Sequence, residues 1–155
     1  MIVAPGARND RDVDDFVIKT GDMIQITVPP PALVPQLMAP VPLVGSSTSV
    51  SIGGQFVCLQ GDELPAAIKG PLTYTAPPFV TPGTGSLQII LMPNNLTTQS
   101  MNGSPMLLKG ATFQALFQVQ SPAMQPTPGG PVPDPLMVKQ CTAQFITTNT
   151  TVMAG

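Results

Sequence analysis

The chain has no histidine and no tryptophan, and it has few charged residues. Histidine is the commonest general base, the usual activator of a nucleophile and the commonest metal ligand, so its absence excludes every catalytic triad built on that side chain. Charged residues make up 9% of the sequence, whereas about 25% is usual for globular domains. We therefore expect a protein that is not an enzyme and whose surface is largely uncharged.

Basic clusters and long apolar runs are also missing. The net charge is −2, the pI is about 4.6 and the few Lys and Arg residues are scattered, which argues against a nucleic-acid partner because phosphate binding requires clustered positive charge. Residues 1–8 are too short an apolar stretch for a secretory signal, and prolines interrupt residues 32–44, which excludes a spanning helix there. We expect a chain made in the cytoplasm without an export signal of its own.

The chain is instead rich in proline, glycine and apolar residues. Of 155 residues, 20 are proline and 14 are glycine, and 43% are hydrophobic. Proline and glycine disfavour helices, whereas this apolar content is too high for a disordered chain. The composition predicts an all-β protein, and the length suits a single domain, residues 1–155, with one core.

Alternation of apolar and polar residues locates the strands. Ile24 and Ile26 alternate with polar neighbours, and Phe113, Ala115 and Phe117 share one face of the clearest strand in the sequence. The second hairpin described below is expected to continue into this strand. The expected strands are residues 23–28, 48–60, 87–92, 98–108, 112–119 and 137–147.

Composition also divides the chain into segments. Residues 1–22 hold most of the acidic side chains and are interpreted as a charged leader, residues 23–147 as the β core, and residues 148–155 as a loose tail or a final small strand. Three proline-rich segments are expected to be connectors, and the first of them to wrap across an apolar surface in extended conformation. These segments are residues 29–42, 71–85 and 121–135.

One motif occurs twice. Residues 49–61 align without a gap on residues 98–110: each copy has a short polar strand, a two-residue turn, an apolar strand and a second glycine. Gly-Gly and Asn-Gly tolerate the positive φ angles that such turns demand, so the motif predicts a duplicated β-hairpin. The carboxylates of Asp62 and Glu63 are expected in a solvated turn. The residues expected to shape the turns are Gly53, Gly54, Gly61, Asp62, Asn102, Gly103, Pro105 and Gly110.

The duplicated hairpin resembles the PAAR repeat of spike-tip proteins in type VI secretion and related contractile injection systems. That repeat has an Asn-Gly turn, then Pro-Ala-Ala-Arg, then Gly-Asp. The first copy here keeps Gly54, Gly61 and Asp62 but replaces the central four residues. The second copy keeps Asn102-Gly103, Pro105 and Gly110. The resemblance covers residues 46–62 and 97–119, and the spacing agrees better than the identities do.

The resemblance implies a small cone-like or barrel-like β domain of repeated hairpins, with long Pro/Gly-rich connectors. Such a part caps a trimeric spike of the VgrG or phage tail-spike type, one copy per trimer, and sharpens it for transient puncture of a target membrane. It implies a structural protein assembled into an injection particle and delivered extracellularly or into the target cell, with an effector cargo left open as a further partner.

A spike tip needs an apolar base, and two apolar stretches are the candidates for it. Few charges and many apolar residues suit an interface that forms without salt bridges. The residues expected to contact the spike are Leu33, Val34, Leu37, Met38, Leu87, Ile89, Ile90, Leu91 and Met92.

The departure from the resembled family concerns metal. Members commonly hold zinc near the tip with histidine and cysteine ligands, and this chain has no histidine. Cys58 and Cys141 supply at most half of a tetrahedral site, and their spacing fits neither a disulfide framework nor a zinc knuckle. We expect two buried free thiols and no cofactor; a site completed by Asp62 or a backbone group is the alternative.

Two other classes of protein remain open. One is a different structural part of a phage-tail-like particle, such as a tail-fibre, cap or baseplate component, for which this composition is ordinary. The other is a ligand-binding β-sandwich, although about seven evenly spaced strands are typical of sandwiches and the expected strands here are unevenly spaced.

Overall fold

The computed structural model describes residues 15–101 and 104–154, and these form strands and short 3-10 turns without an α-helix. The all-β prediction is therefore confirmed. The 3-10 turns are η2 (Pro35–Leu37), η3 (Ala66–Ile68) and η4 (Pro93–Asn95). The strands are β1 (Asp15–Phe16), β2 (Met23–Thr27), β3 (Val41–Pro42), β4 (Ser51–Ile52), β5 (Gln55–Phe56), β6 (Leu72–Ala76), β7 (Phe79–Ile90), β8 (Leu96–Met101), β9 (Ser104–Leu107), β10 (Phe113–Ser121), β11 (Met124–Gln125), β12 (Val132–Pro133), β13 (Val138–Ile146) and β14 (Met153–Ala154).

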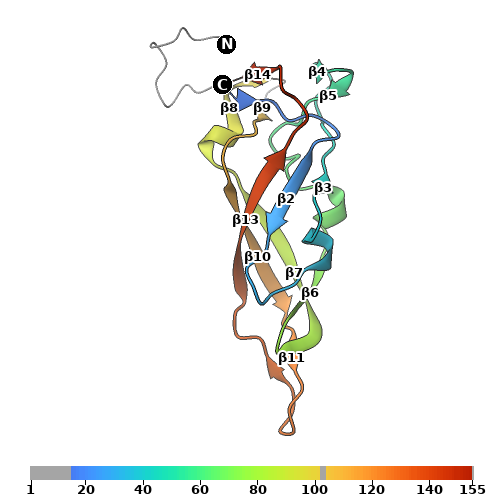
Figure 1. Cartoon of the computed structure of the whole chain (residues 1–155), viewed down its shortest axis with the longest axis vertical. Helices are drawn as coiled ribbons and strands as arrows, with labels where there is room; N and C mark the ends of the chain where they lie inside the picture. The colour runs from blue at the N-terminus through green and yellow to red at the C-terminus, as the bar shows by residue number, and fades with distance from the viewer. Residues whose placement is uncertain (1–14, 102–103, 155) are drawn as a thin grey trace.

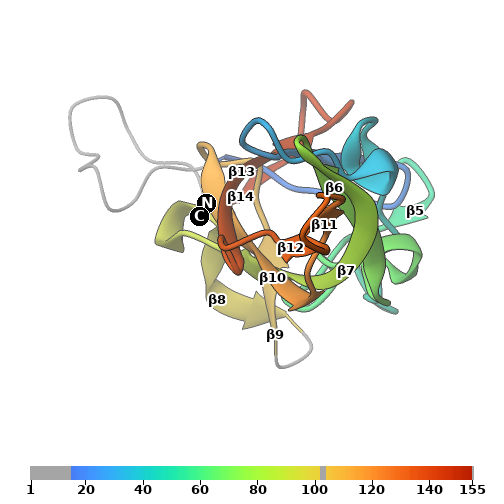
Figure 2. The same cartoon turned by 90° about the horizontal axis from the view of Figure 1, so that it is seen from below.

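One antiparallel sheet forms the body of the molecule. Its strand order is β12-β11-β7-β10-β13-β2-β3, and β6 pairs with β7 as well. The sheet curls around its own apolar face into a half-barrel, as the view along the axis shows (Figure 2). Leu33, which follows β2, bridges to Thr75 of β6 and so brings the two sides of the curl together. A single curled sheet differs from the two packed sheets of a sandwich, so the sandwich alternative is not supported.

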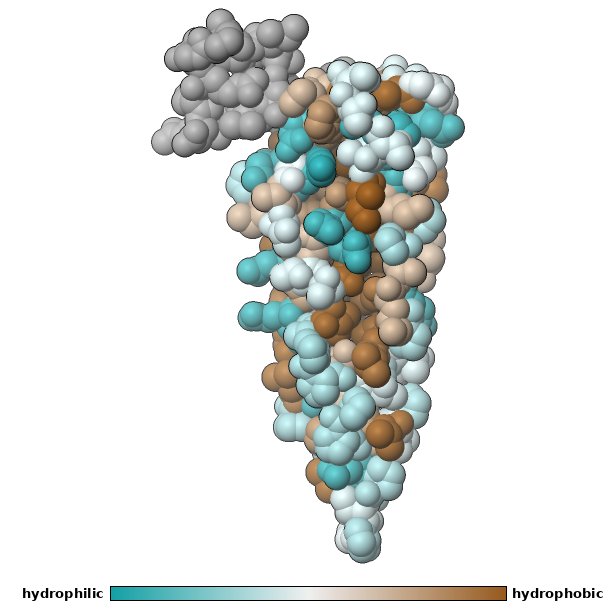
Figure 3. Space-filling view, in the orientation of Figure 1, coloured by the Kyte–Doolittle hydropathy of each residue, from teal (hydrophilic) through white to brown (hydrophobic). Residues whose placement is uncertain are grey.

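The molecule is long and tapers along its axis (Figures 1 and 3). The wide end holds β14 and the hairpins β4–β5 and β8–β9, whereas the narrow end is the β11–β12 hairpin (Figure 1). The connecting turn of that hairpin is closed by the Gly130 amide, which donates to the Thr127 carbonyl at 3.0 Å. These two regions are the wide end and the narrow end of the molecule.

The main core fills the curl and follows the predicted alternation. Ile24 and Ile26 of β2 are buried, as are Phe113, Ala115 and Phe117 of β10. Every second residue of β13 is buried as well. The first proline-rich segment packs on the apolar core as expected, but it is not extended throughout, because it includes the 3-10 turn η2. It contributes buried side chains to the core: Ala32, Val34, Leu37 and Val41.

All three expected connectors contain strands, since residues 29–42 include β3. Residues 71–85 include β6 and the first half of β7, and residues 121–135 include β11 and β12. Proline is tolerated in β7 because the register against β6 shifts between Tyr74 and Ala76, opposite the segment that contains Pro82. The expected continuation of the second hairpin into β10 is wrong, because β10 pairs with β7 and β13 instead.

The boundaries of the β core also need correction. Residues 15–22, assigned to the charged leader, include β1 and the buried side chains of Val17 and Ile18. At the other end, β14 pairs with β1, so the alternative of a final small strand holds within residues 148–155. Residues 1–14 lie outside the described part of the chain.

Candidate functional site

Three chain segments meet around a common axis at the wide end. Ile18, Cys58 and Leu107 sit at equivalent places, and their main chains form a closed circle of hydrogen bonds. The amide of Ile18 donates to Leu107 at 3.0 Å, that of Leu107 to Cys58 at 2.9 Å, and that of Cys58 to Ile18 at 2.8 Å. We call this arrangement the three-fold ring; its segments are residues 16–20, 56–60 and 105–109.

A second circle of contacts repeats the same relation. The bridges Lys19 to Val57, Leu59 to Met106 and Leu108 to Val17 each join the fourth residue of one segment to the second residue of the next. The fifth residue of each segment likewise donates its amide to the first carbonyl of a neighbour: Thr20 to Phe56 at 2.9 Å, Gln60 to Pro105 at 2.8 Å and Lys109 to Phe16 at 2.8 Å. One chain therefore reproduces, with three different sequences, the pairing expected of a three-fold symmetric object.

Side chains follow the ring's symmetry as well. The middle residues, Ile18, Cys58 and Leu107, are fully buried and belong to the main core. Their neighbours in the segments point to the opposite side, because successive side chains in extended backbone alternate. There they make a second small core at the wide end, composed of Val17, Val57, Leu59, Met106 and Leu108.

Each ring segment is followed by a glycine with positive φ. Gly21, Gly61 and Gly110 have φ values of 95°, 108° and 54°, a region that side chains with a Cβ rarely adopt. After two of them comes an aspartate: Asp22 accepts the Lys19 amide at 2.9 Å and Asp62 accepts the Leu59 amide at 2.8 Å.

The third copy has Ala111 at the aspartate position, and a different residue replaces its function. The main-chain oxygen of Asn95 accepts the amide of Leu108 at 2.7 Å, and the Asn95 amide group donates to the carbonyl of Lys109 at 3.1 Å. The amides of the fourth residue in each segment, Lys19, Leu59 and Leu108, are therefore all hydrogen-bonded. Asp62 lies in a turn, where it is half-buried, and its Oδ2 also accepts the Ser46 amide and hydroxyl at 2.9 and 2.7 Å.

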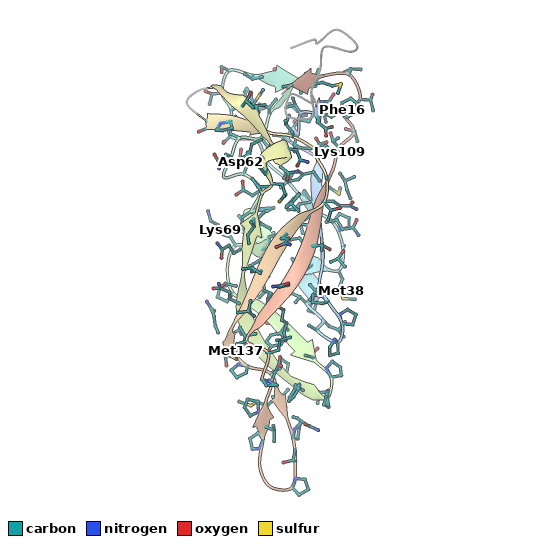
Figure 4. All side chains as sticks on the ribbon, turned by 90° about the vertical axis from the view of Figure 1, so that its left-hand side faces the viewer. Phe16, Met38, Asp62, Lys69, Lys109 and Met137 are labelled. Carbon is teal, nitrogen blue, oxygen red and sulfur yellow. The ribbon has the colours of Figure 1, made fainter. Side chains whose placement is uncertain are left out.

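A hairpin leads into each ring segment. In each hairpin one strand continues into the ring, and we call the other one the outer strand; one residue of each outer strand pairs with the first residue of the ring segment. The hairpin β4–β5 leads into residues 56–60 and β8–β9 into residues 105–109. The third is assembled from the two ends of the described chain, because β14 pairs with β1. The corresponding pairs are Ser51 with Phe56, Ser100 with Pro105, and Met153 with Phe16. Figure 4 shows a teal strand of the β4–β5 hairpin and the red strand β14 lying across the wide end, with Phe16, Asp62 and Lys109 below them.

The sequence interpretation found two copies of this motif and missed the third. Phe16-Val17 followed by Gly21-Asp22 repeats Phe56-Val57 followed by Gly61-Asp62 residue for residue in spacing. That signal lay inside the segment taken for a charged leader. The missing turn concealed it further, since the partner strand of β1 lies at the opposite end of the chain.

The predicted turn residues are largely placed as expected. Gly53 and Gly54 have positive φ values of 57° and 84° in the turn of β4–β5, and Pro105 lies in β9. Proline has no amide hydrogen to donate. Pro105 fits at this place because its equivalent position in the three-fold ring needs only a carbonyl oxygen, which accepts the Gln60 amide. Asn102 and Gly103 lie outside the described residues.

The predicted spike contacts are not gathered at one end. Val34, Leu37 and Leu87 are at most 6% exposed and belong to the main core, so the expectation that they contact a partner is wrong: the curl of the sheet turns them inward. Leu33, Met38, Ile90 and Met92 are exposed, whereas Ile89 and Leu91 are half-buried. Met38 projects from the flank, between the two ends (Figure 4).

Cys58 and Cys141 are buried free thiols, as predicted. Burial raises the pKa of Cys58 to about 12, with Asp62 and Asp22 adding to the effect, and burial raises the pKa of Cys141 to about 11. Within residues 15–101 and 104–154, no three His, Cys, Asp or Glu side chains come together as a metal site would need. No helix in the same residues has the length and apolarity needed to span a membrane.

A buried polar network fixes the narrow end. Lys139 Nζ lies 2.7 Å from Asp134 Oδ2, and the Tyr74 hydroxyl donates to the same oxygen at 3.0 Å. The Ala123 amide donates to the Tyr74 hydroxyl at 3.0 Å, and the Asp134 amide donates to the Ala123 carbonyl at 2.8 Å. Both strands that lead to the β11–β12 hairpin are thus fastened to β6 and β13. Sequence reasoning missed this network because Tyr74 lies far along the chain from Asp134, Lys139 and Ala123.

The network also sets the ionisation of its members. Burial alone would raise the pKa of Asp134, but hydrogen bonds from Lys139, the Leu136 amide and Tyr74 outweigh it and lower that pKa. Burial raises the pKa of Tyr74. Asp134 and Lys139 are the only charged residues between positions 110 and 155, so the two charges of this part of the chain are paired and inside.

Comparison with known proteins accounts for this architecture. No curated protein matches the sequence. The profile of one family, described as contractile injection system spike tip protein, matches residues 13–155, which include all three ring segments and the narrow end. Because that match covers most of the chain, the protein belongs to the contractile injection system spike tip family, a structural rather than enzymatic family, and is a component of such a particle.

Proposed function

We propose that one copy of this protein caps a trimeric spike, with its wide end docked on the spike and its narrow end leading. The observation that carries the proposal is the circle of equivalent main-chain hydrogen bonds around Ile18, Cys58 and Leu107. A monomer on a three-fold axis meets three identical chains, and it can contact all of them alike only if it presents three similar faces. The three-fold ring with its three hairpins supplies such faces.

We propose further that the ring is a diverged relative of the PAAR repeat. Support comes from the Gly-Asp pairs that close two of the ring segments and from the tight turn at Gly53-Gly54. Val17, Val57 and Met106 pack against one another in the small core beside the ring. The three-fold ring is thus held by main-chain hydrogen bonds and a small apolar core.

The narrow end suits transient passage through a target membrane. Its sole charged residues, Asp134 and Lys139, are buried and paired, so entry of this end into an apolar phase exposes no unpaired charge, whose transfer is costly. Five large apolar side chains are exposed at this end or beside it: Val80, Val132, Leu136, Met137 and Val138. After contraction of the particle this end would meet the target cell first, with delivery outside the producing cell or into the target.

Substitutions at two exposed residues can distinguish docking by the wide end from docking by the flank. Phe56 is 48% exposed at the wide end, and Met38 is 71% exposed on the flank. Phe56→Asp would place a charge in the proposed interface, whereas Met38→Asp is the matched control. Binding to the trimeric spike protein of the same particle is measured for both by surface plasmon resonance.

We expect Phe56→Asp to weaken binding at least about tenfold, since an unpaired charge in an interface is strongly unfavourable. We expect Met38→Asp to bind like the unchanged protein. The reverse pattern would show docking by the flank. Absence of any complex with the spike would favour the second candidate, another structural component of the particle.

A further inference from the structure

The outer strands of the three hairpins have open edges at equivalent positions. In a two-residue hairpin, hydrogen-bonded and non-hydrogen-bonded residue pairs alternate away from the turn. Val57 donates its amide to Val50 at 3.1 Å, and Val17 donates to Val152 at 3.2 Å. The adjacent pairs, Ser51 with Phe56 and Met153 with Phe16, are therefore of the non-bonded kind.

At such a pair the main-chain groups of both residues point away from the hairpin. The carbonyls of Phe16, Phe56 and Pro105 point into the ring, where they accept the amides of Lys109, Thr20 and Gln60. The amides and carbonyls of Ser51, Ser100 and Met153, on the opposite strands, consequently point outward. Among the described residues these groups of Ser51 and Met153 have no hydrogen-bond partner.

We infer that these three edges, Ser51, Ser100 and Met153, are sites of β-strand addition that pair main chain to main chain with three strands of the spike. The inference rests on the proposed function, and it names how the wide end recognises its partner. An unpaired strand edge is a ready template for another strand. Here the two unpaired edges at Ser51 and Met153 and the corresponding strand position at Ser100 lie around one axis, so the occupant that pairs with all of them is a three-fold β-structure.

Main-chain pairing also explains how a symmetric partner could bind three equivalent positions that carry different side chains. The outer residues are serine in two copies and methionine in the third, so a symmetric partner meets no common side chain there. Main-chain groups are the same in every copy. Recognition by the edge therefore tolerates sequence divergence among the three copies, whereas recognition by side chains would not.

Proline substitution distinguishes recognition through the main-chain amide from recognition through the side chain. Ser51→Pro removes an amide that faces outward and is not used within the hairpin, so the hairpin keeps its own hydrogen bonds. Met153→Pro does the same in the third copy. The matched controls are Ser51→Thr and Met153→Leu, which change the side chain and keep the amide. Circular dichroism and thermal unfolding establish that each variant is folded.

The readout is affinity for the trimeric spike protein of the same particle. Loss of one main-chain hydrogen bond predicts about fivefold weaker binding for each proline variant, and about 25-fold for the double proline variant if the edges act independently. The double control variant should bind like the unchanged protein. Hydrogen exchange should show the amides of Ser51 and Met153 protected only in the complex.

Three results overturn the inference. Equal binding by the double proline and double control variants would refute strand pairing and leave capping by the wide end intact. Loss of self-association in the proline variants, without an effect on spike binding, would identify a second copy of this chain as the occupant. Failure of the unchanged protein to bind the spike would overturn the strand pairing and the proposed function together.

Discussion

Removal of the charge at position 139 tests the idea that the buried network holds the narrow end together. Lys139 and Asp134 are 3% and 4% exposed, and their charged atoms lie 2.7 Å apart. Lys139→Met keeps most of the apolar stem but leaves the Asp134 carboxylate buried without its counter-charge. Tyr74 and the Leu136 amide remain as its hydrogen-bond donors.

The expected cost follows from the burial of both partners. Breaking a buried ion pair by removing one member costs about 3–5 kcal/mol, and in a domain of this length each kcal/mol lowers Tm by about 2–4 °C. We therefore expect Lys139→Met to lower Tm by roughly 6–20 °C. Urea unfolding at pH 7, followed by circular dichroism, measures the free energy directly.

A matched control is available on the flank. Lys69 is exposed and makes no ion pair among the described residues, so Lys69→Met should change stability by less than about 0.5 kcal/mol. The pKa of Asp134 is lowered in the folded state, so its stabilising effect is present above the ordinary carboxyl pKa of about 3.9 and is lost as the pH falls below it. The difference between the unchanged protein and Lys139→Met should shrink over that range. A Lys139→Met variant as stable as Lys69→Met at pH 7 would refute the role of the network.

The other predictions concern the turns and the thiols. Gly54→Val should destabilise by more than about 1 kcal/mol relative to Gly70→Val, because both positions have open space beside the glycine but only Gly54 has positive φ, 84°; equal unfolding free energies would contradict this. Cys58 and Cys141, whose pKa values burial raises to about 12 and about 11, should react with Ellman's reagent at pH 8 only after unfolding, and rapid labelling of the folded protein would be inconsistent with it. Elemental analysis of protein purified without chelator should find no stoichiometric zinc, and one zinc lost on Cys58→Ser would overturn that prediction.

The sequence predicted the strands and turns that depend only on neighbouring residues. The strands at residues 23–28, 112–119 and 137–147 follow from alternation, because each has one face on the core, and β2, β10 and β13 lie there. The turn at Gly53-Gly54 follows from its glycines. Residues 71–85 were misassigned because proline was read as a sign of a connector, whereas a register shift admits Pro82 into β7.

The rest depends on contacts between distant residues. Whether Val34 and Leu87 face a partner or the core is decided by the curl of the sheet, which apolarity alone does not reveal. The three-fold ring could have been predicted by aligning Phe16-Val17 and Gly21-Asp22 with the same residue types in the first hairpin, because that repeat is present in the sequence. The pairing of β14 with β1, which completes the third hairpin, joins the two ends of the chain and leaves no local trace.

The stoichiometry of the spike complex tests the central claim most directly. The protein has a mass of 16.1 kDa, so native mass spectrometry of the complex, isolated after co-expression with the spike protein of the same particle, counts its copies without ambiguity. If the three-fold ring caps a three-fold axis, the complex contains one copy of this chain and three spike chains. One copy for each spike chain, or a trimer of this protein alone, would contradict the account.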